Sequence, residues 1–265
     1  MLAILRLVNI SKSYENKARV FSAKVRKVEA VKSVSFSIKQ GETLGLVGES
    51  GCGKSTLSKL IVKLLQPDSG DIFFKNINIT QLKEKKFRSL RRKIQIVFQD
   101  PYASLSPRLK VKEIIAEPLS AFNYEKQYIL KRIQEIITQV GLNSGHLEAF
   151  PHQLSGGQRQ RVGIARALTS FPELVILDEP VSSLDLSTQA QILNLLVSLQ
   201  NIYKLTYLFI SHDLSVVRCM SDRVAVMYRG TIVEQAEASQ IYEWPVHPYT
   251  KKLLLSKCWL RTAQK

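Results

Sequence analysis

The sequence predicts an α/β fold with a mostly parallel core sheet, because it contains short apolar runs that each end in polar residues. Four runs are mainly apolar: TLGLVG (43–48), IQIVF (94–98), LVIL (174–177) and YLFI (207–210). Continuous apolar runs are typical of strands buried on both faces, as in parallel sheets. Open α/β sheets bind ligands at the carboxyl ends of their strands, where these polar residues lie. We therefore expect the chemistry of the protein at these strand ends.

Antiparallel strands are predicted as well. Apolar and polar residues alternate from Ile4 to Ile10, as in a half-buried strand. Two hairpins are predicted, 71–79 with its turn near Lys75 and Asn76, and 223–236 with its turn at Arg229 and Gly230. These segments indicate an antiparallel β-subdomain beside the parallel core.

Helices are predicted between the strands. Apolar residues recur at helical spacing from Leu57 to Leu64, and Pro67 ends this pattern. The segment 125–142 carries an apolar stripe of isoleucines and a valine at helical spacing. Because the whole region from Gln99 to Leu154 is mostly helical in pattern, we expect a helical subdomain inserted into the α/β core.

Composition limits the class of protein. The 265 residues are 45% hydrophobic, which is enough for a sizeable core, and no apolar run approaches the roughly 18 residues that cross a bilayer. We expect a cytoplasmic protein that is soluble or peripheral to a membrane. Cys52, Cys219 and Cys258 lie too far apart for a zinc site and are odd in number, so no disulfide framework is indicated.

The net charge of +16 is compatible with binding to nucleic acid or to an anionic membrane leaflet, or with a solvated basic surface. Basic residues cluster at 17–32 and 82–93.

A phosphate loop is the strongest local signal. The segment GESGCGKST matches the pattern G-x-x-x-x-G-K-[ST] in full, between a predicted strand and a predicted helix. Its glycines let backbone N–H groups approach phosphate oxygens, Lys54 supplies a charge for the β- and γ-phosphates, and the Ser55 hydroxyl can ligate Mg²⁺. The predicted nucleotide site comprises Gly48, Glu49, Ser50, Gly51, Cys52, Gly53, Lys54, Ser55 and Thr56.

Polar residues at three other strand ends complete a site for hydrolysis. Asp178 directly follows an apolar run and is placed to hold the metal, and Glu179 beside it to act as general base. His212 follows the run YLFI, where it can contact the γ-phosphate or orient the attacking water. Gln99 ends another strand and can join the cluster of Mg²⁺ and water. Catalytic roles are thus predicted for Lys54, Glu179 and His212, and metal contacts for Ser55, Gln99 and Asp178.

These motifs, taken in order, resemble those of ATP-binding cassette (ABC) ATPases. GESGCGKST, Gln99, LSGGQ (154–158), LVILDEP (174–180), SSLD (182–185) and SHD (211–213) follow the family order over nearly the whole chain. The resemblance implies the ABC type of P-loop NTPase fold over 1–240, with a helical subdomain at about 99–165 and a short extension at 241–265. It also implies ATP and Mg²⁺ as cofactors, and stacking of Tyr14 on the adenine ring.

A second anion cradle is predicted where a serine and two glycines open a helix, at LSGGQ (154–158), and the resemblance explains why one chain carries two of them. In this family two cassettes pack head to tail, so Ser155, Gly156, Gly157 and Gln158 would contact the ATP held by the partner's phosphate loop. A helix N-terminus with unpaired N–H groups suits that role. Asp185 would lie at the same dimer interface. ATP would then hold the dimer together, and hydrolysis would open it.

Three features are similar to the oligopeptide, dipeptide and nickel importer branch: FQDPYASLSPRLKV from Phe98, the basic insertion between Tyr14 and Val28, and HPYTKKLL from His247. This branch implies an ATPase subunit peripheral to the cytoplasmic face of the plasma (inner) membrane. Its partners would be a second ABC ATPase, either a paralogue or a second copy, two transmembrane permease subunits and, indirectly, an extracytoplasmic substrate-binding protein. Peptide and nickel both stay open as substrates.

One alternative function rests on the charge. A net charge of +16 also suits a soluble ABC ATPase that acts on nucleic acid or ribosomes. The sequence has a single cassette and no aromatic and basic stacking platform, so nucleic acid is not expected as a partner. Redox control through Cys52 is a weaker idea, because any small residue fits that place in the loop.

Overall fold

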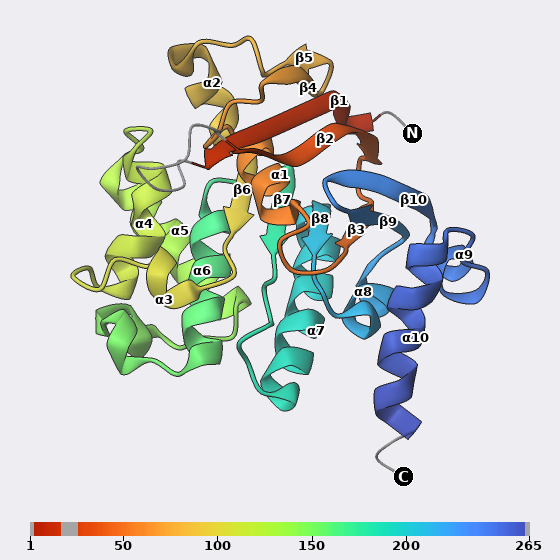
Figure 1. The fold of residues 1–265 in the computed structure, drawn as a ribbon. Helices are drawn as coiled ribbons and strands as arrows, with labels where there is room; N and C mark the ends of the chain where they lie inside the picture. The colour runs from red at the N-terminus through yellow and green to blue at the C-terminus, as the bar shows by residue number, and fades with distance from the viewer. Residues whose placement is uncertain (1–2, 17–25, 263–265) are drawn as a thin grey trace, which may run out of the picture. The chain divides into compact units, whose positions relative to one another are not determined.

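The computed structural model describes residues 3–16 and 26–262 of the chain (Figure 1). The chain folds into two compact units, which we call unit 1 (Met1–Lys83 with Leu208–Lys265) and unit 2 (Glu84–Tyr207). Strand β8 (Thr206–Ile210) begins in unit 2 and ends in unit 1. The basic insertion predicted from the sequence falls partly on residues 17–25, which lie outside the described residues.

Unit 1 contains an antiparallel sheet with the strand order β2-β1-β4-β5. Its strands are β1 (Ala3–Asn16), β2 (Arg26–Lys39), β4 (Ser69–Phe74) and β5 (Ile77–Asn78). Leu7 pairs with Phe36 across β1 and β2, and both are buried. The predicted hairpin is confirmed, with φ of 48° at Lys75 and 64° at Asn76 in its turn. Two consecutive positive φ angles are what a two-residue turn of type I′ requires.

Unit 1 also carries a part of the mixed sheet, with the order β10-β9-β3. Strand β3 (Thr43–Val47) is parallel to β9 (Arg223–Tyr228), and β9 is antiparallel to β10 (Thr231–Glu237). The predicted turn between β9 and β10 is confirmed at Arg229 and Gly230, both with positive φ. All five residues of β3 are buried, as its apolar sequence predicts. The helices of this unit are α1 (Lys54–Ile61), α8 (Leu214–Met220), α9 (Ala238–Glu243) and α10 (Pro248–Thr262).

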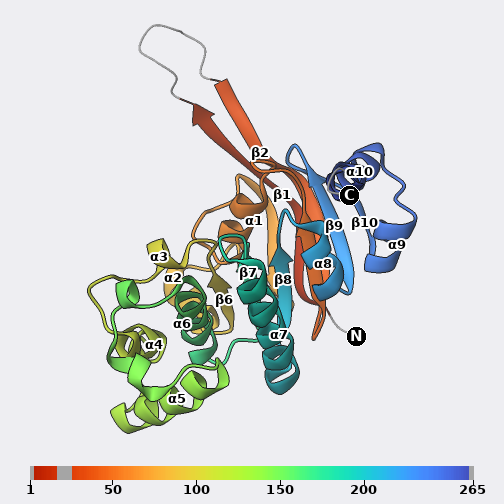
Figure 2. The same cartoon turned by 90° about the horizontal axis from the view of Figure 1, so that it is seen from below.

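Unit 2 joins two parallel strands to a group of helices. Strand β6 (Ile94–Val97) is parallel to β7 (Leu174–Asp178), and the N–H of Thr206 at the start of β8 donates to the carbonyl of Glu173. The α-helices are α2 (Glu84–Arg91), α3 (Pro101–Ser104), α4 (Val111–Ser120), α5 (Lys126–Gln139), α6 (Gly156–Thr169) and α7 (Leu186–Tyr203). Two short 3₁₀ helices, η1 (Ser144–Glu148) and η2 (Pro151–Gln153), lead from α5 to α6. Helices α4, α5 and α6 pack together (Figure 2), and α5 buries the isoleucine stripe that the sequence predicts.

These elements confirm the predicted α/β class, with parallel strands, an antiparallel β-sheet and a helical region. One helix ends earlier than its apolar pattern predicts. Helix α1 stops at Ile61 rather than near Pro67, because Lys63 adopts a left-handed conformation with φ of 58°. The Lys63 ammonium donates a hydrogen bond to the carbonyl of Ile79, so a different segment of unit 1 contacts this left-handed residue just after the helix. Among the described residues, no helix is long and apolar enough to cross a bilayer.

Candidate nucleotide site

The phosphate loop lies between β3 and α1, and its glycines are required by close backbone contacts. A Cβ added to Gly48 would lie 2.2 Å from the carbonyl oxygen of Met227, and one added to Gly53 would lie 2.2 Å from that of Ala30. Gly51 differs, since a Cβ there would meet nothing within 4 Å, and its φ of 81° still favours glycine. The loop therefore packs against the protein at its two ends and stays open in its middle, where an anion can approach.

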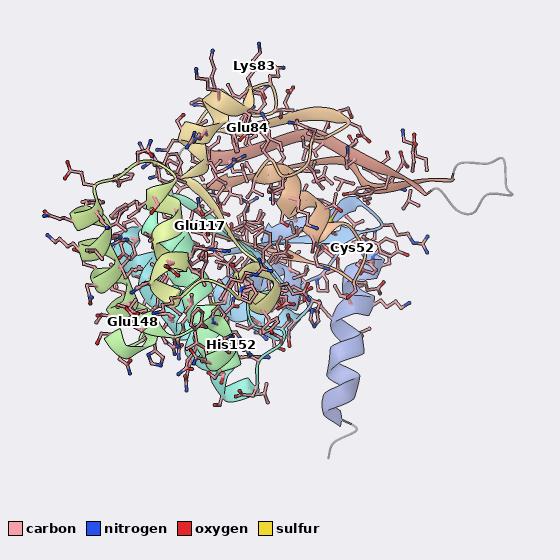
Figure 3. The ribbon with its side chains drawn as sticks, turned by 90° about the vertical axis from the view of Figure 1, so that its left-hand side faces the viewer. Cys52, Lys83, Glu84, Glu117, Glu148 and His152 are labelled. Carbon is pink, nitrogen blue, oxygen red and sulfur yellow. The ribbon has the colours of Figure 1, made fainter. Side chains whose placement is uncertain are left out.

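Lys54 opens α1 and points back into the loop. Its side chain is 4% exposed, and its ammonium donates to the carbonyl oxygens of Gly48 (2.7 Å) and Glu49 (2.9 Å). Cys52 of the same loop is buried (Figure 3), and its sulfur lies 3.8 Å from the Lys54 ammonium. Burial raises the pKa of the Cys52 thiol, although the charge of Lys54 acts in the opposite direction. The loop thus holds one buried cation, and its cysteine stays a neutral thiol at ordinary pH.

In unit 2 the structure brings two predicted residues together. Strand β7 ends at Asp178, which is 4% exposed, and Glu179 follows with a φ of 49°. A positive φ is uncommon outside glycine and marks a position that the surrounding structure holds in place. The amide nitrogen of Gln99 donates to a carboxylate oxygen of Glu179 at 3.1 Å. A hydrogen bond therefore joins Gln99 to Glu179, and a carboxylate has further lone pairs that can accept hydrogen bonds.

Two other predicted residues lie in unit 1. His212 is exposed and lies two residues after the end of β8. The next residue, Asp213, caps α8 by accepting from the N–H of Ser215 at 2.9 Å. Tyr14 lies in β1 opposite Val28 and is 41% exposed. An exposed ring on a strand is available for stacking on a flat ligand.

The segment LSGGQ opens α6 with a complete capping box. The Ser155 hydroxyl accepts from the N–H of Gln158 at 3.2 Å, and the Gln158 side chain accepts from the N–H of Ser155 at 2.9 Å. These reciprocal hydrogen bonds fix the first turn of the helix. Gly156 and Gly157 lie on this turn, so it carries no bulky side chain at these two positions. The amide nitrogen of Gln158 also lies 3.1 Å from Nε2 of His146 in η1. Helix α6 therefore begins at the residues predicted to form an anion cradle, and their contact with an anion stays a prediction.

Asp185 caps the next helix of unit 2. Its carboxylate accepts from the N–H of Thr188 at 2.9 Å and from the Thr188 hydroxyl at 2.7 Å, at the start of α7. The hydrogen bond from the Thr188 N–H lowers the pKa of Asp185. Asp185 is exposed, so its charge remains available at the surface.

Comparison with known proteins identifies the family. Residues 31–182 match the ABC transporter family, which is more than half of the chain. The chain belongs to this family. It is 52% identical to the oligopeptide transport ATP-binding protein AppF of Bacillus subtilis (strain 168), over 96% of this chain and 78% of that protein. It is 49% identical to the glutathione import ATP-binding protein GsiA of Pectobacterium atrosepticum, over 95% of this chain and 40% of that protein.

A solved structure gives the same result for the fold. The chain is similar to the dimeric ATP-binding cassette MJ0796, solved in a post-hydrolysis state bound to ADP and Pi, with a TM-score of 0.77 and 32% identity. This similarity covers 88% of this chain and 98% of that one. The protein is therefore an ABC ATPase that binds ATP, as its sequence motifs predict.

Some contacts of this ABC ATPase were not predicted from its sequence. The Tyr249 hydroxyl accepts from the N–H of Glu49 in the phosphate loop, Thr188 holds Asp185, and His146 lies against Gln158. The segment HPYT is similar to the importer branch, but nothing in its residue spacing predicts a contact with Glu49, 200 residues earlier in the chain. The same is true of His146, which lies in the short 3₁₀ helix η1 and belongs to no sequence motif.

Gly157, the second glycine of the segment LSGGQ (the signature, 154–158), packs closely against the next helix, and this leads to a prediction. A Cβ on Gly157 would lie 2.5 Å from the Thr188 methyl group, and Thr188 is the residue that holds Asp185. We expect Gly157→Ala to displace Thr188 and lower the free energy of unfolding by about 1–3 kcal/mol, the usual cost of overpacking. Denaturant unfolding followed by circular dichroism measures this change.

A matched control for this prediction lies on the same helix. An added Cβ on Gly163 meets nothing within 4 Å, so Gly163→Ala should keep or raise stability, by up to about 1 kcal/mol, since alanine is the better helix former. Equal stability of the two variants would show that Thr188 accommodates the extra methyl group, contrary to the prediction.

Proposed function

We propose that the protein is the ATP-hydrolysing subunit of a peptide importer. The observation that carries this proposal is the 52% identity, over 96% of the chain, to an oligopeptide transport ATP-binding protein. The 49% identity to a glutathione import ATP-binding protein supports the same substrate class, because glutathione is itself a small peptide. Nickel is the other substrate of the branch that the sequence resembles. Measurements of peptide and nickel uptake distinguish the two substrates.

The geometry within each unit supports the roles that we infer for the site residues. The open middle of the loop Gly48–Thr56 would receive the phosphates of ATP, with Lys54 as the cation for the β- and γ-phosphates. Tyr14 would stack on adenine. The signature residues Ser155–Gln158 would contact the ATP of a second cassette, and Asp185 would lie at that interface. The capped N-terminus of α6 supports this role, because its first turn presents N–H groups and glycines to an anion.

The residues assigned to magnesium fit that ion. Ser55, Gln99 and Asp178 offer a hydroxyl, an amide and a carboxylate oxygen, and Mg²⁺ prefers such hard oxygen ligands together with substrate phosphates and water. Asp178 is held at the end of the buried strand β7, which gives its carboxylate a fixed place. When bound, the ion neutralises charge on the phosphate oxygens.

Hydrolysis needs a group that takes a proton from water. We assign this role to Glu179, whose hydrogen bond from Gln99 holds the carboxylate in one orientation. The water oxygen forms a bond to the γ-phosphorus, the bond from that phosphorus to the ADP oxygen breaks, and the water proton passes to Glu179. His212 would orient the water and the γ-phosphate. ADP and phosphate leave, and contacts of the γ-phosphate to Gln99 and to the partner's signature are lost.

The partners follow from the same proposal. A second ABC ATPase, as a paralogue or a second copy, would pair with this chain, and two transmembrane permeases would anchor the pair at the cytoplasmic face of the plasma membrane. A substrate-binding protein outside the membrane would deliver the peptide. The segment from α3 to Leu109 is our candidate for the permease contact. Tyr102 is 58% exposed there, and Arg166 of α6 donates to the carbonyl of Ser104 at 2.7 Å, so this surface is in direct contact with α6.

Affinity purification tests the proposal. The tagged chain is recovered from gently solubilised membranes, and the proteins that accompany it are identified by mass spectrometry. We expect two multi-span permeases and a second cassette ATPase, and loss of labelled pentapeptide uptake, but not of ⁶³Ni²⁺ uptake, in cells that lack the gene. Loss of nickel uptake alone would overturn the peptide assignment. Recovery of ribosomes or nucleic acid without a membrane partner would favour the alternative that the charge of +16 suggests.

A further inference from the structure

One peptide group of the phosphate loop is held at both of its ends. The peptide that joins Gly48 to Glu49 offers its carbonyl oxygen to the Lys54 ammonium at 2.7 Å. Its N–H donates to the hydroxyl of Tyr249 at 3.2 Å. Because the peptide group is planar, fixing its N–H also fixes the direction of its carbonyl oxygen. Tyr249 therefore acts, through one rigid group, on the oxygen that holds Lys54.

Tyr249 is itself held firmly. It is the second residue of α10, is 9% exposed, and its ring lies 4.1 Å from the ring of Tyr228 between centroids, at an angle of 31°. The turn after Tyr228 also contacts the loop, because the N–H of Gly230 donates to the carbonyl of Cys52 at 3.0 Å. The start of α10 and the turn between β9 and β10 thus brace the phosphate loop together. All of these residues belong to unit 1.

The segment before Tyr249 is anchored by a carboxylate. Glu234 of β10 accepts from the N–H of Val246 at 2.7 Å and from the N–H of His247 at 3.0 Å. Burial acts against the charged form of Glu234, but the hydrogen bonds that it accepts outweigh burial and lower its pKa. Nδ1 of His247 in turn accepts from the N–H of Tyr249 at 3.1 Å. The position of the Tyr249 hydroxyl is therefore set by a chain of polar contacts as well as by ring packing.

We propose that Tyr249 is a positioning residue for ATP: through the Gly48–Glu49 peptide its hydroxyl orients Lys54 toward the phosphates. The inference rests on the proposed ATP site and goes beyond it, because it gives the C-terminal segment a part in nucleotide affinity. Ring packing against Tyr228 accounts for a purely structural role. It does not account for the hydroxyl, whose partner is a backbone N–H of the phosphate loop itself.

Tyr249→Phe tests the hydroxyl alone, since it keeps the ring. We expect the dissociation constant for ATP, measured calorimetrically on the full chain with Mg²⁺, to rise about two- to tenfold, which is the usual weight of one hydrogen bond. Tyr242→Phe is the matched control, because the Tyr242 hydroxyl donates to the carbonyl of Leu214 in α8 rather than to the loop. The control should bind ATP like the wild type.

Thermal unfolding without nucleotide separates positioning from folding. We expect the two variants to have similar melting temperatures, with ATP raising that of Tyr249→Phe by less than that of Tyr242→Phe. If the wild type binds ATP and Tyr249→Phe binds it equally well, the positioning role is wrong while the ATP site stands. If the wild type itself binds no ATP, the proposed site and the inference fall together.

Discussion

Glu179→Gln is expected to lower the rate of ATP hydrolysis by about 10²–10⁴-fold, the usual contribution of a general base. The substitution removes the group that takes the proton and keeps nearly the same shape. The amide that replaces the carboxylate still offers an oxygen to the Gln99 amide nitrogen, so the contact at 3.1 Å can be preserved. ATP binding should therefore stay within about twofold of the wild type, since this hydrogen bond is kept.

Phosphate release with saturating ATP measures the rate, and calorimetry measures the affinity. Glu173→Gln is the matched control, because Glu173 lies just before the same strand and forms an ion pair with Lys93 at 3.2 Å. It should hydrolyse ATP at nearly the wild-type rate. A Glu179→Gln variant with normal hydrolysis would remove Glu179 from the mechanism.

The same variant reports on the dimer. If hydrolysis opens two cassettes that ATP holds together, a chain that binds ATP without hydrolysing it should accumulate as a dimer. Gel filtration with ATP is expected to move Glu179→Gln to twice the monomer mass, whereas ADP should leave it monomeric. A dimer that forms equally with ADP would show that the γ-phosphate is not what holds the chains together.

Local chemistry explains why so much of the site is predictable from sequence. The capping box at Ser155–Gln158 and the turns at Lys75 and Arg229 are each decided by residues within a few positions of one another, and the sequence pattern of the phosphate loop spans only nine residues. The contacts of Lys54 with Gly48 and of Ser155 with Gln158 are of this kind. In such segments the backbone has few allowed conformations, and the residue types that permit them are visible in the sequence.

Contacts between distant segments are what the sequence does not reveal. The N–H of Glu49 meets Tyr249 only after the chain has folded, and the reason for glycine at 157 is a methyl group of Thr188 on the next helix. The early end of α1 has the same origin, since Lys63 finds its partner at Ile79. Tertiary contacts override local preference at these positions, and no periodicity reports them.

Lys54→Ala is expected to weaken ATP binding by about 100-fold. A charged donor contributes about 1.5 kcal/mol or more to each hydrogen bond, so losing contacts to both the β- and the γ-phosphate costs about 3 kcal/mol. The buried setting of Lys54 strengthens this expectation, because water replaces a lost cation less effectively at a site that is 4% exposed.

The control for this prediction lies on the same helix. Lys59 is exposed in the last turn of α1, and Lys59→Ala should bind ATP as the wild type does, which separates the effect of place from that of net charge. Lys54→Arg should also bind weakly, because a longer, planar guanidinium does not reproduce the two hydrogen bonds that the compact Lys54 ammonium donates to the carbonyls of Gly48 and Glu49. Strong binding by Lys54→Arg would mean that any cation at the start of α1 suffices. In that case the orientation that Tyr249 imposes on the loop would matter less than the charge itself.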